Sequence, residues 1–198
     1  MLSVSHPVAQ KLLDRVLARV DGFPITLTDV QTAIGLGVIQ VPQGQDPIAA
    51  GMQQVIDRQL ELTEVQRFPP PEPDRASIDR EAARLKMNGG ARLPALMQST
   101  GLTEQRIADI ARDNLRIAAY LDQRFGTIVQ VSDDEVAAYY RTHEAEFTRG
   151  GDAISFEEAE PMARQRVSNE RRRATLEQWI RDLRSRADVA RNPPITNR

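Results

Sequence analysis

Residues 16–26 read VLARVDGFPIT, and they contain the clearest local structure signal near the start of the chain. Two short extended runs, Arg15–Val20 and Phe23–Thr26, flank the pair Asp21-Gly22. An Asp-Gly pair between such runs is a strong hairpin signal, because the tight turn of a hairpin needs positive φ at its central residues. We therefore predict a β-hairpin over these residues.

Side chains that cap helices recur downstream of this hairpin, each before apolar residues at helical spacing. The predicted helices run from Thr26 to Gly35, from Pro47 to about Arg67, from Asp74 to Asn88, over Leu93–Ser99, from Thr103 to Phe125, from Ser132 to near Phe147 and from Ser155 to about Arg186. Residues 69–73 form a stiff proline-rich connector, and Pro161 predicts a kink or a restart in the last helix. Short extended segments are expected at 127–131 and 188–190.

Composition excludes several classes of site and partner. The 198 residues contain no cysteine and only two histidines, which excludes thiolate chemistry and disulfides and disfavours a histidine metal site. A net charge of −2 argues against a general nucleic-acid binder. We expect no membrane-spanning segment, because no run approaches the roughly 18 apolar residues that a span needs. Lys11, Asp14 and Arg15 interrupt the early apolar pattern, so residues 1–20 do not form an intact signal peptide.

Charge is segregated along the last third of the chain. Residues 132–160 hold nine acids and two arginines, whereas residues 164–186 hold eight arginines and three acids. Opposite charges on neighbouring helices favour two solvated faces that attract each other. The polar stretch 168–173 is expected to be solvated or to lie against acids.

No motif for catalysis is present: the chain has neither a G-x-S-x-G elbow nor an H-E-x-x-H pair. His143 lacks a marked nucleophile or orienting partner, and Asp133–Glu135 are best explained as a helix cap. Trp179 is predicted to be a core anchor. Methionine side chains adapt to varied partners. The short helix that follows Asn88-Gly89-Gly90 is expected to be a movable wall of a peptide groove. The predicted peptide-binding residues are Met52, Met87, Leu93, Leu96 and Met97.

The order of these elements resembles the N-terminal domain of SurA-type periplasmic chaperones and parvulin-like peptidyl-prolyl isomerases. The likeness rests on residues 16–26, on GLTE at 101–104, on VSDDEVAAYY at 131–140, and on SFEEA at 155–159 leading to Trp179. It implies a mainly α fold with a small antiparallel sheet, made by the hairpin and a C-terminal strand, and a long C-terminal helix. It further implies one domain over residues 1–191, with the helix 155–187 packing back on it. The composition and terminal position of residues 192–198 predict a disordered tail.

The chain departs from this family where the isomerases carry their catalytic module. In those members a parvulin domain lies between the Tyr-Tyr helix and the C-terminal helix, but here that interval is Thr148–Ile154, seven residues. A domain needs at least about 50 residues. The resemblance therefore implies a non-catalytic protein without cofactor or metal, located in the periplasm or otherwise outside the cytoplasm. Its partners would be extended apolar segments of unfolded outer-membrane or secreted proteins, not nucleic acid.

Two alternatives stay open at this point. One is a structural or assembly module that forms a homodimer by exchanging its terminal helix or strand. The other is a peptidyl-prolyl isomerase with an unrecognised site.

Overall fold

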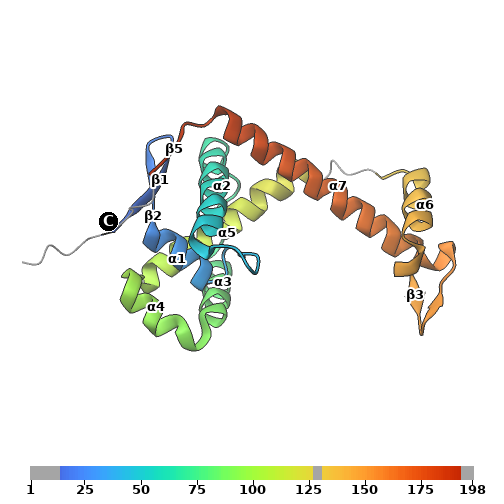
Figure 1. Cartoon of the computed structure of the whole chain (residues 1–198), viewed down its shortest axis with the longest axis horizontal. Coiled ribbons are helices and arrows are strands. Elements are labelled where there is room, and N and C mark those ends of the chain that lie inside the picture. Colours follow the sequence, from blue (N-terminus) through green and yellow to red (C-terminus); the bar gives the residue numbers. More distant parts are fainter. Residues whose placement is uncertain (1–13, 127–130, 193–198) are drawn as a thin grey trace, which may run out of the picture.

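The computed structural model describes residues 14–126 and 131–192, which form two unequal lobes joined by a long helix (Figure 1). The strands are β1 (Val16–Val20), β2 (Phe23–Thr26), β3 (Thr148–Arg149), β4 (Asp152–Ala153) and β5 (Val189–Arg191). The helices are α1 (Leu27–Gly35), α2 (Pro47–Arg67), α3 (Arg75–Gly89), α4 (Leu93–Thr100), α5 (Glu104–Phe125), α6 (Asp133–Thr142) and α7 (Phe156–Arg186). Most of the expected segment 127–131 and the tail 193–198 lie outside the described residues.

The hairpin and the end of the chain form one three-stranded antiparallel sheet, in the order β2-β1-β5. The turn between β1 and β2 places Asp21 at φ 48° and Gly22 at φ 82°, as the Asp-Gly signal predicts. β5 pairs with the other edge of β1, with Arg19 opposite Ala190. Asn192, the first residue of the expected disordered tail, is held instead, because its backbone N–H donates to Leu17 O at 2.9 Å. The sheet therefore joins the two ends of the described chain, as predicted.

Helices α1 and α2 pack closely because of one glycine. A Cβ built on Gly51 would lie 2.9 Å from Cγ1 of Val30 and 3.0 Å from Cδ1 of Ile34, so only a glycine fits without a shift. α1 itself begins with the predicted capping box, in which Asp29 N–H donates to Thr26 Oγ1 at 3.2 Å and Thr26 N–H donates to Asp29 Oδ2 at 3.0 Å.

Gly51→Val is expected to lower the free energy of unfolding by about 1–3 kcal/mol, because the added methyl groups overpack the α1–α2 contact. The matched control is Ala49→Val on the same helix, where the side chain is exposed and the β-branched residue costs only a few tenths of a kcal/mol. Urea unfolding of the two variants measures the difference. Equal stabilities would contradict the tight packing at Gly51.

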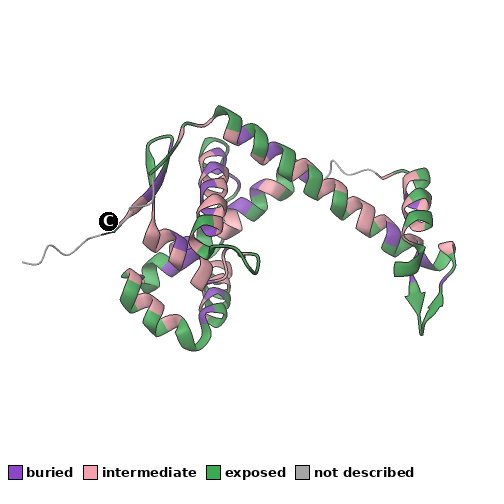
Figure 2. Ribbon diagram, viewed as in Figure 1, coloured by how far each residue is buried: buried purple, intermediate pink, exposed green. Residues whose placement is uncertain are grey.

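The buried side chains form three clusters. The first lies between the sheet and helices α1, α2, α5 and α7, and contains Trp179 as expected. The second lies among α3, α4 and α5 around Leu85 and Ile107. The third forms the smaller lobe, where Val136, Phe147 and Ala163 pack together. Figure 2 shows the separation, since the buried residues of α7 lie toward its two ends.

The smaller lobe ends α6 earlier than the sequence predicts. α6 stops at Thr142 and a short turn over Glu144–Glu146 follows, whereas the prediction carried the helix to near Phe147. The physical reason is that the turn brings Phe147 back into the third cluster, where the residue is 1% exposed. The next residues form a tight hairpin of β3 and β4, so the seven-residue interval 148–154 is a closed turn.

Helix α7 runs without interruption across Pro161, so the expected restart is absent. The proline lies in the second turn and removes only the hydrogen bond that its N–H would give to Glu157, a loss that is tolerated near a helix end. The Ser155 side chain caps the helix by accepting from the backbone N–H of Glu158.

Ion pairs between α6 and α7 confirm the predicted attraction of the two charged faces. Arg164 lies 2.6 Å from Asp133, and Arg171 pairs with Glu135. In the polar middle of α7, Arg172 lies 3.6 Å from Asp122 at the end of α5. The first two pairs hold α6 on α7, and the third holds α7 on α5. Arg171 and Arg172 agree with the expectation that residues 168–173 lie against acids.

Candidate functional site

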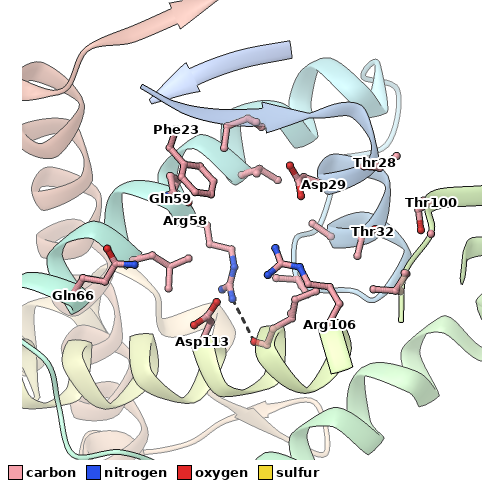
Figure 3. A pocket seen from close by; sticks show the side chains of 18 residues that line it. Phe23, Thr28, Asp29, Thr32, Arg58, Gln59, Gln66, Thr100, Arg106 and Asp113 are labelled. Atoms are coloured by element: carbon pink, nitrogen blue, oxygen red, sulfur yellow. Dashed lines mark hydrogen bonds between the residues drawn. The ribbon is translucent and has the colours of Figure 1, made fainter. Parts of the chain in front are cut away.

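A pocket of about 390 Å³ opens where the β2–α1 corner faces helices α2 and α5 (Figure 3). Ligand pockets in proteins commonly fall between about 300 and 1,000 Å³, so this volume is sufficient for a small group or a few side chains. Its apolar lining includes Phe23, Ile25, Val38, Val55, Leu62 and Ile110. Its polar lining includes Arg58, Gln59, Gln66, Arg106 and Asp113.

Local structure explains why these residues meet. Positions 55, 58, 59, 62 and 66 share one face of α2, and positions 106, 110 and 113 share one face of α5, since residues three or four apart lie on the same side of a helix. The hairpin contributes Phe23 just after its turn, where the side chain is 53% exposed. Phe23 therefore forms part of the lining while remaining accessible to solvent.

Arginine and aspartate side chains converge where α2 faces α5, as Figure 3 shows for Arg58, Arg106 and Asp113. The Arg58 guanidinium donates to the backbone oxygen of Ile110 at 3.5 Å, which is a long hydrogen bond. Within residues 14–126 and 131–192, neither Arg58 nor Arg106 forms an ion pair within 4.0 Å.

Burial changes the proton affinity of the charged groups around the pocket. Burial lowers the pKa of Arg58, and the like charge of Arg106 acts in the same direction, against the raising effects of Asp113 and Glu61. Burial also raises the pKa of the Asp113 carboxyl, with Arg58 opposing it. Burial raises the pKa of Glu61, one turn along α2 from Arg58, to about 7. The Glu61 carboxyl beside Arg58 therefore changes its charge near neutral pH.

The five residues predicted from the sequence lie elsewhere. Leu93, Leu96 and Met97 come together on α4, where they are partly buried against the second cluster. Met52 packs against the first cluster, and Met87 is 80% exposed on α3. None of the five lines the pocket. Their contact with a client stays a prediction.

Sequence reasoning missed the residues that do line the pocket, above all Phe23, Arg58, Arg106 and Asp113. A usable signal was the spacing of Arg106, Ile110 and Asp113, which places two charges on a line with an apolar residue of the same helix. That spacing fixes a shared helix face. It does not say which other helix covers that face.

The described residues also lack two other features, a membrane-spanning helix and a metal-binding cluster. No helix there is long and apolar enough to span a membrane. No group of three or more histidine, cysteine, aspartate or glutamate side chains there is arranged to hold a metal ion.

No protein-family model matches the chain, and no curated protein sequence matches it. Its fold does match a solved structure from Campylobacter jejuni, from work that describes the virulence factor PEB4 and the periplasmic protein Cj1289 as two structurally related SurA-like chaperones. The match has a TM-score of 0.58 at 10% identity and covers 90% of this chain and 99% of that one. The chain therefore has a SurA-like helical fold with a small antiparallel sheet, as the sequence predicts.

Proposed function

We propose that the chain is a non-catalytic chaperone-like protein that holds extended apolar segments of non-native polypeptides. The pocket between the β2–α1 corner, α2 and α5 would be a contact site for such a segment. The binding mechanism is reversible burial of apolar surface, supported by a few polar contacts and without covalent chemistry.

The observation that carries this proposal is the mixed apolar and polar pocket within a SurA-like body. Its apolar side chains can cover part of an exposed segment, and its glutamines and arginines can bond to the polar backbone of that segment. The half-exposed ring of Phe23 offers apolar surface to a bound chain at the edge of this pocket. The likeness to a structure described as a SurA-like chaperone, over 90% of this chain, supports the same activity.

The proposal includes a location outside the cytoplasm, which rests on the resemblance and on the periplasmic description of one of the two Campylobacter proteins. Fractionation of the source cells tests it. Recovery of the full-length chain only in the cytoplasmic fraction would contradict this part of the proposal.

We expect the wild-type chain to suppress the aggregation of a chemically denatured protein, measured by light scattering. Phe23→Ser is expected to raise the chain concentration needed for half suppression about fivefold, because it removes about 1 kcal/mol of apolar burial from the contact. Met162→Ser is the matched control, since Met162 is 45% exposed on the smaller lobe and far along the chain from the pocket.

Three outcomes would contradict the proposal. The first is a wild-type chain that forms a dimer and ignores the client, which would favour the assembly module. The second is acceleration of proline-limited refolding at catalytic concentrations, which would indicate an isomerase. The third is an equal loss of suppression in Phe23→Ser and Met162→Ser, which would remove the pocket from the contact.

A further inference from the structure

Two guanidinium groups in the pocket lack an anionic partner at ion-pair distance within the described residues. Arg58 is partly buried, and its one hydrogen bond goes to a backbone oxygen at 3.5 Å. Arg106 is exposed on the side of α5 that lines the pocket. Its side chain forms no hydrogen bond to any described residue. A guanidinium carries five N–H donors in a planar fork, so most of the donors of this pair are bonded to no described protein group.

Several carboxylates lie near the two arginines, but none lies within 4.0 Å of either guanidinium among the described residues. Glu61 and Glu81 act on Arg58 only from a greater distance. Burial raises the pKa of Glu61 to about 7, and Glu81 already pairs with Arg84 at 2.6 Å. Asp113 faces Arg58 and Arg106 from α5 but lies beyond 4.0 Å from both, and burial raises its pKa. Asp29 also lines the pocket, yet its Oδ2 already accepts from the backbone N–H and the hydroxyl of Thr26 in the cap of α1. A charge that is partly removed from water is costly without a partner, so the pocket is suited to receive an anion.

Apolar side chains surround this donor pair and restrict the kind of anion. Ile110 follows Arg106 by one turn of α5, and Leu62 follows Arg58 by one turn of α2. Phe23 faces them from β2, as Figure 3 shows, and Ile25 of the same strand also lines the pocket. A group that fits this lining carries its negative charge beside an apolar side chain.

We propose that the pocket binds a carboxylate carried next to an apolar side chain of an extended polypeptide, with Arg58 and Arg106 as the donors. This inference rests on the proposed function, which supplies the polypeptide. A planar carboxylate can accept two parallel N–H donors from a guanidinium, and such charge-assisted pairs are about twice as strong as neutral hydrogen bonds. The carboxylate can belong to the chain terminus or to an acidic side chain, and the chemistry of recognition is shared.

Isothermal titration calorimetry with three short peptides tests the inference and separates the two sources. The first is acetyl-Ala-Val-Phe with a free terminal carboxylate, the second is the same peptide as the amide, and the third is acetyl-Ala-Glu-Val-Phe amide. The terminal acid is expected to bind about ten times more tightly than its amide. If the third peptide binds as the acid does, an acidic side chain serves equally; if it binds as the amide does, the pocket selects the chain end.

Arg106→Met keeps most of the side-chain length and removes the charge, so the tenfold preference for the acid over the amide is expected to disappear. Arg58→Met is the second variant and tests the partly buried donor. If one of the two substitutions disturbs folding, the other still tests the role of the guanidinium pair. The matched control is Arg92→Met, an exposed arginine without an ion pair among the described residues, which is expected to keep the preference.

Failure of this inference can be told apart from failure of the proposed function. Equal binding of acid and amide, or loss of the preference in Arg92→Met alone, would overturn carboxylate recognition. If aggregation suppression by the wild-type chain persisted in that case, the chaperone proposal would stand without it. Absence of both peptide binding and suppression would overturn both.

Discussion

Trp179→Ala is expected to lower the free energy of unfolding by about 3–5 kcal/mol, the usual cost of removing a large buried aromatic side chain. Trp179 is 7% exposed and belongs to the first cluster. Its ring lies between two rings of α5, with centroids 5.9 Å from Tyr120 and 5.4 Å from Phe125. The tryptophan therefore packs the last third of α7 against α5 and the first cluster, and so helps to position β5, which follows α7.

Urea unfolding followed by far-UV circular dichroism measures this loss, since the variant lacks the only tryptophan. Trp179→Phe is the matched control, because it keeps a ring in the site and should cost markedly less than the alanine. A loss below about 1 kcal/mol for Trp179→Ala would show that other contacts dock α7, such as the pair of Arg184 with Asp57.

Features determined by near neighbours in the chain were predictable from the sequence. The Asp21-Gly22 turn needs only the backbone freedom of two residues, and the Thr26 cap needs only a side chain three residues away. The pairing of β5 with β1 joins residues far apart in the chain. It followed from the resemblance to SurA-type proteins and could not come from local pattern.

Features that depend on tertiary contact were missed or only half predicted. Ser155 and Glu158 have the spacing of a capping box, and Ser155 does accept from the Glu158 N–H. The Glu158 carboxylate, however, lies 3.4 Å from Arg149 of the β3–β4 hairpin, a contact that local spacing does not reveal. The early end of α6 has the same origin, since burial of Phe147 outweighs continuation of the helix.

The pocket was missed for a related reason. Helical spacing shows which residues share a face, but the pocket forms only because that face of α2 meets α5 across from the hairpin. The search for adaptable methionine side chains selected residues by type, without knowing which helix faces meet. It therefore chose Met52, which packs against the core, and Met87, which is exposed on α3.

Glu61→Gln is expected to stabilise the protein at pH 8 and to leave its stability almost unchanged at pH 5. Burial raises the pKa of Glu61 from 4.5 to about 7, with Arg58 opposing and Asp57 adding to the effect. Between these two values the folded chain keeps a proton that the unfolded chain has released. Stability therefore falls as pH rises through this window, and the loss is complete above pH 7.

The size of this effect is on the order of 3 kcal/mol, because each pKa unit corresponds to about 1.4 kcal/mol. Glutamine keeps the shape of the protonated acid and does not titrate, so the variant should lose most of the slope. The charges around Glu61 remain in both proteins: Asp57 pairs with Arg184 of α7, and Arg58 is faced by Glu81 of α3 and by Asp113 and Arg106 of α5.

Urea unfolding at pH 5, 6, 7 and 8 measures the slope, with Glu144→Gln as the control because Glu144 is exposed and forms no ion pair among the described residues. A slope that persists in Glu61→Gln would contradict the assignment of the pH dependence to Glu61.

The same variant also tests whether the charge of Glu61 affects anion binding in the pocket. If the charge of Glu61 weakens anion binding at Arg58, Glu61→Gln should bind the acid peptide at pH 8 as tightly as the wild-type chain does at pH 5.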